Sequence, residues 1–514
     1  TAVPEKWGGL GLPKRVTALV TERMAAYGSF SVTYGAHSGI GTLPIVYFGN
    51  EEQKGRFLPK LASGELIGAY ALSEPGSGSD ALGARTVAKL NDEGTHYVLN
   101  GTKQWITNGA FADVFIVFCQ IVDADGTANF SALIVEKDTG GFSIGPEEHK
   151  LGIRGSSTTP LIFEDALIPI ENVLGEIGRG HEIAFNILNV GRYTLAVGVT
   201  GGAKQALHRA ISYASERKQF KTPVIEFGAL RQKVANAAAD IYAMEALSFR
   251  VAGLTDAMTT EMGELAENAS GRDKMRPIEE YAIESSIGKV WCSEKLNEIA
   301  SECLQMYGGY GYVEDYPAEM AFRDARINMI FEGTNEVNRL LIPGMLLKRA
   351  MKGRLPVMAW LGALGNEAGQ VGEGPLEAER DATERFKGVA GVLLQAAAMK
   401  YMRELEGQQQ ILLLLADLIS DCYVADSAVG RSVKRHRRGM KTDLTDAMAR
   451  VTLARAQDRV RANAGHLLSA MFEGDAYDAM ETRLKGFWPN FRSNLVADRK
   501  QIADAVVATG GYQI

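Results

Sequence analysis

The segment Tyr70-Ala71-Leu72-Ser73-Glu74-Pro75-Gly76-Ser77-Gly78-Ser79-Asp80 stands where the chain changes from helical to β character. Its two glycines permit a close approach of the backbone to a ligand, and its three serines supply hydroxyl groups. Gly/Ser segments are just as common in loops that merely join two domains. The segment alone therefore predicts a loop and leaves open whether that loop binds a ligand.

Residues 70–175, which begin with this segment, have the pattern of a β domain. Short β-branched and aromatic runs recur there, and Gly, Asn and Asp turns separate them. The runs are His96–Leu99, Val114–Gln120, Ser131–Val135 and Leu161–Phe163. Their spacing predicts a compact antiparallel β domain.

Helical patterns lie on both sides of the β domain. Residues 1–69 are predicted to form an N-terminal helical domain, with an amphipathic stretch from Asn50 to Leu61. Residues 176–350 are predicted to form a second helical domain. Its periodicity is clearest over two stretches that are rich in Ala and Leu, Arg192–Arg217 and Phe227–Val251.

The last part of the chain is a linker followed by further helices. Six glycines and two prolines between Gly353 and Pro375 predict a linker at residues 351–375. Residues 376–514 are predicted to form an appended helical domain with charged faces. No βαβ alternation and no GxGxxG occurs, so neither a doubly wound sheet nor a Rossmann turn is expected.

The composition excludes several classes of protein. The composition, 46% hydrophobic and 23% charged, is typical of globular proteins, and 514 residues are enough for two to four domains. A net charge of −7 argues against a nucleic-acid-binding protein. The cysteines show neither CxxC spacing nor a histidine cluster, so no metal site or disulfide framework is expected. Each is instead predicted to be a small buried side chain: Cys119, Cys292, Cys303 and Cys422.

No apolar run reaches the ~18 residues that a membrane span needs. The best candidate, Ile411–Ile419, contains Asp417 and is too short. The chain opens without an initiator Met and without a signal-peptide pattern. We therefore expect that an N-terminal segment precedes the first residue given.

Two further segments have residues suited to a cofactor. Gly101-Thr102-Lys103-Gln104-Trp105-Ile106-Thr107-Asn108-Gly109 sets an aromatic ring between hydroxyl groups, although in isolation a buried Trp is the simpler interpretation, and Asn108-Gly109 is typical of a hairpin turn. Arg217, in Glu216-Arg217-Lys218-Gln219-Phe220, suits a pyrophosphate but is also compatible with a solvated helical charge. Gly308-Gly309, within residues 303–312, would let the backbone approach the same group.

The fourth segment, Arg323-Asp324-Ala325-Arg326-Ile327-Asn328-Met329-Ile330-Phe331-Glu332-Gly333-Thr334-Asn335-Glu336, carries a candidate base. A charged helix face gives way to Met-Ile-Phe and then to a carboxylate. A Glu held against Ile330 and Phe331 would be desolvated, which raises its basicity. Abstraction of a proton α to a thioester needs such a base, although a lone Glu at a helix end needs no function.

In this order and at these separations, the four segments resemble the acyl-CoA dehydrogenase family. The resemblance covers residues 4–345 and includes the stretches Pro4–Gly11 and Phe48–Lys54. Ile187–Arg192 and the C-terminal extension resemble the very-long-chain branch. The resemblance implies a mostly α fold with a central β-barrel-like domain, a four-helix dehydrogenase domain and an extra C-terminal helical domain.

The same resemblance implies a set of site residues around FAD. Glu332 is the expected catalytic base, and Gly191 stands where the isovaleryl-type branch carries its base. The cofactor residues implied are Tyr70, Leu72, Ser73, Ser79, Trp105, Ile106, Thr107, Thr334 and Glu336. Residues implied to reach the FAD of a neighbouring subunit are Arg217, Gln219, Phe220, Gln305, Gly308 and Gly309. Substrate contacts are implied at Ser79, Asn189, Arg192, Phe331 and Gly333.

The implied reaction is α,β-dehydrogenation of a fatty acyl-CoA by a homodimer, with electrons passed to an electron-transfer flavoprotein. The implied location is the cytoplasm of a bacterium, or the mitochondrial matrix or inner-membrane face of a eukaryote. Two alternatives stay open, an acyl-CoA oxidase and an assembly or scaffold protein. Chain-length preference is not readable from the sequence.

A basic cluster marks the appended domain. Six cations fall within residues 431–441, and the apolar run Ile411–Ile419 lies one helix-length upstream. An amphipathic helix with adjacent cations would dock peripherally on an anionic membrane. A packed helix that ends in a solvated basic turn explains the same pattern. Both interpretations are kept.

Overall fold

The computed structural model describes residues 2–263, 271–365, 368–369 and 371–514. The chain divides into two compact units. Unit 1 consists of Thr1–Gly202, Val251–Ser285 and Arg323–Gly333. Unit 2 consists of Ala203–Arg250, Ser286–Phe322 and Thr334–Ile514.

The N-terminal part of unit 1 is helical. Its elements are α1 (Lys14–Met24), α2 (Gly28–Gly35), a π-helical segment (Ala36–Gly41), α3 (Leu43–Phe48) and α4 (Glu51–Ser63). A capping box starts α4, because Asn50 Oδ1 accepts from Gln53 N at 2.8 Å and Gln53 Oε1 accepts from Asn50 N at 3.1 Å. The helix predicted from Asn50 is therefore confirmed.

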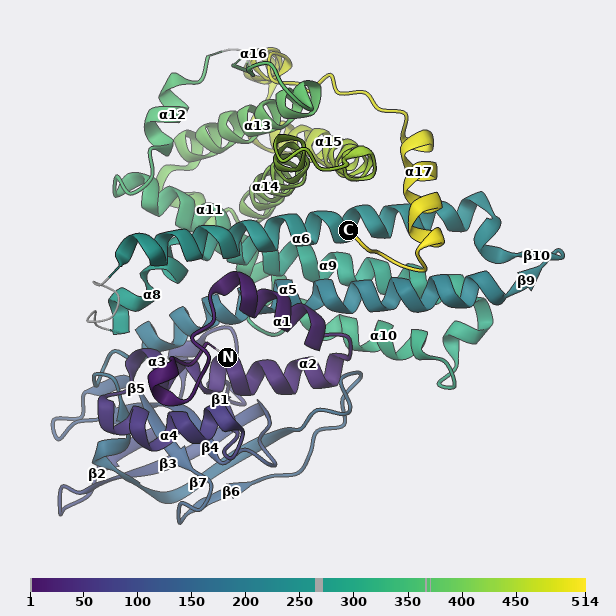
Figure 1. The fold of residues 1–514 in the computed structure, drawn as a ribbon. Helices are drawn as coiled ribbons and strands as arrows, with labels where there is room; N and C mark the ends of the chain where they lie inside the picture. Colours follow the sequence, from purple (N-terminus) through teal and green to yellow (C-terminus); the bar gives the residue numbers. More distant parts are fainter. Residues whose placement is uncertain (1, 264–270, 366–367, 370) are drawn as a thin grey trace. The chain divides into compact units, whose positions relative to one another are not determined.

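The central part of unit 1 is a sheet with strand order β6-β7-β3-β2-β4-β5-β8, and β1 pairs with β4 (Figure 1). The strands are β1 (Gly68–Ala71), β2 (Val87–Leu90), β3 (His96–Thr107), β4 (Val114–Val122), β5 (Ala128–Glu136), β6 (Phe142–Ile144), β7 (Thr158–Pro169) and β8 (Val173–Leu174). Each run predicted to be a strand lies within one of them.

The prediction of an antiparallel β domain is correct for β2–β3, β3–β7, β4–β5, β5–β8 and β6–β7, but β4 pairs in parallel with both β1 and β2. After β3 the chain passes over β2, so β3 and β4 are consecutive but not neighbours. Asn108 and Gly109 consequently form a turn between two strands that do not pair with each other, rather than a β-hairpin. The spacing of apolar runs along the sequence predicts strands but not which strands become neighbours in the sheet.

Strand β4 is buried on both faces. Val114, Ile116 and Phe118 belong to a core cluster that includes Phe57 and Leu58 of α4. The alternate residues of β4 belong to a second cluster, formed with β3 and β7: Phe115, Val117, Cys119 and Ile121. Burial on both faces explains why β4 reads as a continuous apolar run.

Long helices follow the sheet. They are α5 (Gly180–Glu216), α6 (Gly228–Met262), α8 (Gly271–Glu280), α9 (Ala282–Tyr307), α10 (Pro317–Arg326) and α11 (Asn335–Met351). The short strands β9 (Lys218–Gln219) and β10 (Thr222–Pro223) form a hairpin between α5 and α6. The helical periodicity predicted for Arg192–Arg217 and Phe227–Val251 is confirmed. The ends at Arg217 and Phe227 agree to within a residue, whereas α5 begins earlier and α6 ends later than predicted.

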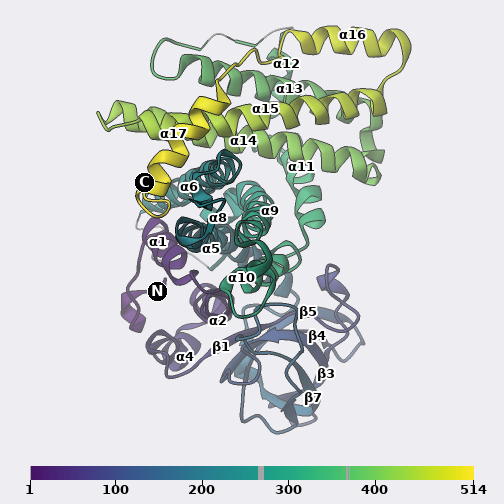
Figure 2. The same cartoon turned by 90° about the vertical axis from the view of Figure 1, so that its right-hand side faces the viewer.

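The C-terminal part of unit 2 is a helical bundle (Figure 2). Its helices are α12 (Val357–Ala363), α13 (Glu377–Tyr401), α14 (Gln409–Arg437), α15 (Asp443–Met471), α16 (Gly474–Lys485) and α17 (Leu495–Ala508). Helices α13, α14 and α15 pack side by side. Residues 351–375, which the sequence predicts to be a linker, contain the short helix α12.

The apolar run Ile411–Ile419 forms the first half of α14 and faces the bundle. Ile411, Leu412, Leu415 and Leu418 are all buried. Further along α14, the buried Asp421 forms an ion pair with the half-buried Arg459 of α15 at 2.6 Å. None of the described helices combines the length and the apolar character that a bilayer span requires.

Candidate active site

The carboxylate of Glu332 lies against the backbone of α5. A Cβ added to Gly191 would stand 2.8 Å from the carboxylate carbon of Glu332, which is closer than real side chains approach. Glu332 itself has a φ of 59°, and Gly333, which follows it, has a φ of 78°. Two consecutive left-handed residues turn the chain sharply at this point, and the missing side chain of Gly191 leaves space for the carboxylate.

Arg192 is the next residue of α5 and holds the same segment. Its Nε donates to the main-chain carbonyl of Glu332 at 3.3 Å, and its Nη1 donates to Asn189 Oδ1 at 2.9 Å. Both Arg192 and Asn189 are buried. Burial lowers the pKa of Arg192, although the charge of Glu332 opposes this shift. The arrangement places a buried cation beside the candidate base, in unit 1.

Tyr70 contributes a further buried polar group beside Glu332. Its hydroxyl donates to the carbonyl of Ala184 at 3.3 Å. Burial raises the pKa of Tyr70 well above its usual value, and the charge of Glu332 raises it further. Tyr70 is therefore a neutral donor at any physiological pH. The expected apolar wall around Glu332 is incomplete, however, because Ile330 is 48% exposed.

Trp105, in unit 1, has a solvent-exposed side chain. The ring is 58% exposed, and the residue has a φ of 59°. The pairing of β3 with β7 shifts register between Lys103 and Ile106, so Trp105 lies at a bulge that turns it out of the sheet. The interpretation of a buried Trp was therefore wrong. Ile106 is buried, and Thr107 is half-buried.

The Gly/Ser loop that follows β1 is open on one side. Glu74 N donates to Ser77 O at 2.9 Å and Ser77 N donates to Glu74 O at 3.1 Å, which closes a two-residue turn at Pro75-Gly76. A Cβ at Gly76 or at Gly78 would meet nothing within 4 Å. Leu72 is buried, Ser73 half-buried and Ser79 exposed. An exposed indole, accessible hydroxyls and an open backbone loop fit the flat ring system expected of FAD.

A buried ion pair joins these two segments, and sequence reasoning missed it. Lys103 is 0% exposed, and its Nζ donates to Glu74 Oε1 at 2.7 Å and to the carbonyl of Leu72 at 3.1 Å. Burial alone would raise the pKa of Glu74, but the charge and hydrogen bond of Lys103, together with hydrogen bonds from Thr86 and Arg85, lower that pKa on balance. A lysine in the middle of a strand within a buried β domain was the signal that could have identified the pair.

Unit 2 holds the residues predicted to reach a neighbouring subunit. Arg217 follows α5, and its guanidinium lies 5.2 Å from the centre of the Tyr310 ring. Tyr310 belongs to the 3₁₀ turn Gly308–Tyr312, which contains both predicted glycines. Gln305 is exposed, as is Gln219 in β9. Phe220, at the tip of the β9–β10 hairpin, is 90% exposed, which is unusual for an aromatic side chain.

The remaining predicted residues lie at the start of α11, in unit 2. The side chain of Thr334 caps this helix by accepting from Val337 N at 3.3 Å. Lys289, which is completely buried, donates to Asn335 Oδ1 at 2.6 Å. Glu336 is exposed. Phe331 and Gly333, which precede the helix, belong to unit 1 and are half-buried.

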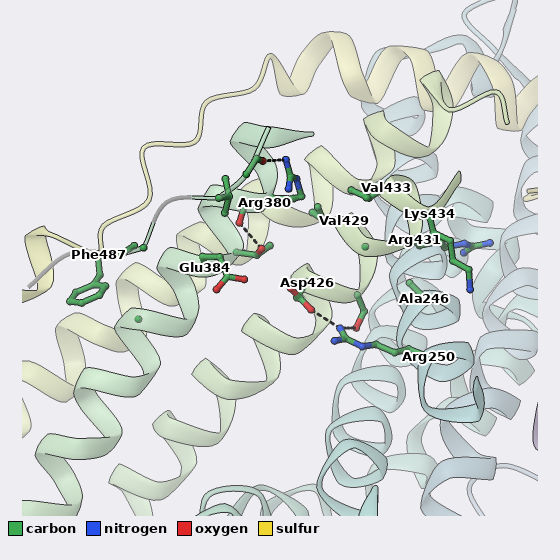
Figure 3. A pocket seen from close by; sticks show the side chains of 18 of the residues that line it. Ala246, Arg250, Arg380, Glu384, Asp426, Val429, Arg431, Val433, Lys434 and Phe487 are labelled. Atoms are coloured by element: carbon green, nitrogen blue, oxygen red, sulfur yellow. Dashed lines mark hydrogen bonds and ion pairs between the residues drawn. The ribbon is translucent and has the colours of Figure 1, made fainter. Parts of the chain in front are cut away.

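A cavity of about 950 Å³ lies elsewhere in unit 2, lined by α6, α12, α13 and α14 (Figure 3). It contains none of the site residues predicted from the sequence. Two ion pairs lie in its lining, Arg250 with Asp426 at 2.6 Å and Arg431 with Glu245 at 2.6 Å, and Arg380, Glu384 and Lys434 line it as well. The lining thus mixes cations and anions and holds no residue of the predicted site, so we assign the cavity no chemistry.

Comparison with known proteins agrees with the resemblance. Family models described as the N-terminal, middle and C-terminal domains of acyl-CoA dehydrogenase match residues 1–65, 69–166 and 178–346. A further model, also described as an acyl-CoA dehydrogenase C-terminal domain, matches residues 386–485. The matched ranges include both sides of the predicted linker.

Three known proteins illustrate the similarity. The chain is 46% identical over 524 residues to "Probable acyl-CoA dehydrogenase" of Bacillus subtilis, covering 100% of this chain and 86% of that relative. It is 32% identical over 471 residues to the mitochondrial very long-chain specific acyl-CoA dehydrogenase of Bos taurus, covering 86% of this chain and 69% of the relative. A solved acyl-CoA dehydrogenase complexed with FAD from Bacillus anthracis superposes with a TM-score of 0.96 at 46% identity, covering 100% of this chain and 88% of that chain.

Proposed function

Because the chain belongs to the acyl-CoA dehydrogenase family and is an FAD-dependent dehydrogenase, we propose that it converts long-chain fatty acyl-CoA thioesters to trans-2-enoyl-CoA in fatty acid β-oxidation, with Glu332 as the base. One observation carries the assignment of the base. The Glu332 carboxylate lies in the space left by Gly191, and its main chain is held by the buried Arg192.

The proposed chemistry divides between the protein and its cofactor. FAD, when bound, supplies the acceptor for the hydride that leaves the β-carbon of the substrate. Glu332 accepts the α-proton and becomes a neutral carboxylic acid. The negative charge that develops on the thioester oxygen needs N–H donors, and the backbone N–H of Glu332 is the donor that the resemblance assigns within this chain.

The residues proposed to hold FAD come from two groups. Tyr70, Leu72, Ser73, Ser79 and the segment Trp105–Thr107 form the first, together with Thr334 and Glu336. The second, proposed to reach the FAD of a partner subunit in a homodimer, contains Arg217, Gln219, Phe220, Gln305, Gly308 and Gly309. The exposure of Phe220 and of the loop glycines supports a role in contacts outside the subunit.

The long-chain preference is supported by the similarity to the bovine very long-chain enzyme, which extends into the appended domain. We further propose that an electron-transfer flavoprotein accepts the electrons, and that the enzyme works in the cytoplasm of a bacterium or the mitochondrial matrix of a eukaryote. The exposed cations Lys434, Arg437, Arg438 and Lys441 are proposed to attract the protein to an anionic membrane surface.

Anaerobic flavin bleaching tests the proposed activity. Purified protein is mixed without oxygen with acyl-CoAs of increasing chain length, and the loss of flavin absorbance is recorded. We expect the fastest bleaching with long chains, and bleaching only with short chains would overturn the proposed preference. Oxygen consumption with peroxide release, in air and without an electron-transfer flavoprotein, would identify an acyl-CoA oxidase instead. An absence of bleaching with every chain length would favour a scaffold protein.

A further inference from the structure

The buried pair Lys103–Glu74 connects a strand and a loop of unit 1 that are separated in the sequence. Lys103 lies on β3, and Glu74 lies in the Gly/Ser loop that follows β1. The backbone of Glu74 closes the turn with Ser77, and its carboxylate accepts three hydrogen bonds. They come from Lys103 Nζ at 2.7 Å, Arg85 N at 2.6 Å and Thr86 N at 3.1 Å.

Lys103 also acts directly on the loop backbone. Its Nζ donates to the carbonyl of Leu72 at 3.1 Å, and the neighbouring Gln104 N donates to the carbonyl of Ser73 at 2.9 Å. The register shift that exposes Trp105 begins at Lys103. The Lys103 side chain therefore holds the loop at Leu72 and Glu74 from the residue at which the register shift around Trp105 begins.

Stability does not explain why a charged pair occupies this position. Removing two charges from water is costly, and apolar residues of similar volume often serve a protein core as well or better. The pair differs from an apolar pair in one respect. Lys103 donates a hydrogen bond to the carbonyl of Leu72, which an apolar side chain at this position could not do.

We propose that Lys103 and Glu74 are positioning residues that hold the loop Leu72–Ser79 and the indole of Trp105 in the relative arrangement that bound flavin requires. This inference rests on the proposed flavin site. The pair acts through the loop backbone and does not itself react. Its loss changes how tightly the flavin is held and how its ring is surrounded.

The test separates positioning from folding with a paired substitution. Lys103→Met leaves the Glu74 carboxylate buried without its partner, so this variant is expected to be less stable. Lys103→Met/Glu74→Gln removes both charges and is expected to recover most of the thermal stability. The donor to Leu72 is still missing in the double variant. We therefore expect its holoenzyme to release FAD at least about tenfold more readily on dilution, with a shifted flavin absorption band.

Asp421→Asn is the control for an ion pair away from these segments, because the buried Asp421 pairs with the half-buried Arg459 in unit 2. It is expected to lower thermal stability while leaving FAD release and the absorption band unchanged. The milder Glu74→Gln variant keeps the Lys103 donor and is expected to show an intermediate effect. FAD release and absorption equal to wild type in Glu74→Gln and in the double variant would overturn the inference, as would a flavin change in Asp421→Asn.

Trp105→Ala distinguishes failure of this inference from failure of the proposed site. If Trp105→Ala weakens FAD retention and the double variant does not, the flavin site stands and the positioning role is wrong. If Trp105→Ala also retains FAD like the wild type, the flavin is not bound at these segments and both proposals fail.

Discussion

At Gly191, the absence of a side chain matters because the carboxylate of Glu332 occupies the space that a Cβ would fill. Alanine at this position of α5 would gain up to ~1 kcal/mol of helix propensity. The same methyl group would overlap the carboxylate, which is the far end of a flexible side chain and can move aside, so the cost stays near the lower end of the ~1–3 kcal/mol usual for overpacking. The two effects nearly cancel in stability, but only the second one moves the proposed base.

Gly191→Ala is therefore expected to fold with a melting temperature close to wild type and to lose most of its kcat. Gly198→Ala on the same helix is the control, since a Cβ there meets its nearest neighbour at an ordinary 3.5 Å. The control should gain stability and keep its activity. Full activity of Gly191→Ala would mean that the Glu332 carboxylate does not need the position described here.

Glu332→Gln tests the base itself. The amide has the same shape as the carboxylate but cannot accept the α-proton, so the variant should fold and bind FAD normally. Because the base is required outright, the loss of turnover should exceed the ~10²–10⁴ typical of general acid–base assistance. Stopped-flow bleaching with acyl-CoA measures it. Activity within tenfold of wild type would move the base to another residue.

At the scale of single elements, the end of α5 and the turn Gly308–Tyr312 form one structural group. The guanidinium of Arg217 lies over Tyr310, and Tyr213 stacks on Tyr307 with ring centres 4.1 Å apart. These contacts orient Arg217 while leaving its donors available for an anion.

Arg217→Ala is expected to weaken FAD retention, because a charge-assisted contact to the pyrophosphate is lost. Gel filtration of the holoenzyme, followed by the ratio of flavin to protein absorbance, measures the effect. Arg231→Ala removes a cation of α6 that is already paired with Asp504, and it should leave the ratio unchanged. Equal retention in both variants would make Arg217 a surface charge only.

The elements themselves were largely predictable, because local chemistry specifies them. Asn50 and Gln53 form their capping box within four residues of sequence, and the helical periodicity of α5 spans many turns. The parallel pairing of β4 with β2 and the buried Lys103–Glu74 pair were not predictable in this way. Both depend on which distant strand or loop becomes a neighbour, and that information is absent from any short window of sequence.

Among the site residues, Trp105 shows the same limit. Its motif suits either a core aromatic or an exposed one, and a register shift two residues earlier decides between them. Glu332 was found because its motif could be recognised. Its contact with Gly191 joins residues 141 positions apart, counted as 332 minus 191, and became visible only in the fold.

At the scale of the whole molecule, the appended domain bears on the membrane hypothesis. Most side chains of the apolar run Ile411–Ile419 are buried within the bundle. They therefore do not form the exposed apolar face that docking on a membrane was expected to use. The exposed cations follow this run, at and after the end of α14: Lys434, Arg437, Arg438 and Lys441. Binding to a membrane would then be electrostatic, with each cation near the surface contributing ~1 kcal/mol.

Sedimentation with anionic liposomes checks this expectation. The full chain should pellet with the vesicles at low salt and be released at high salt, because exposed charges are screened. A variant with Lys434, Arg437, Arg438 and Lys441 changed to Glu should stay in the supernatant under both conditions. Neutral vesicles provide the control. Equal soluble fractions for the two proteins at low salt would refute the membrane role of these cations.

The β9–β10 hairpin has a practical consequence as well. Its tip exposes Phe220 between Lys218 and Lys221, and Phe220 and Lys221 both have positive φ values, 51° and 65°. An exposed, tightly turned loop with two lysines is a preferred site for nicking by trypsin. If partner contacts cover the tip, cleavage there should be slow in the assembled enzyme and fast in the free subunit. Limited proteolysis at this loop would thus report assembly without any measurement of turnover.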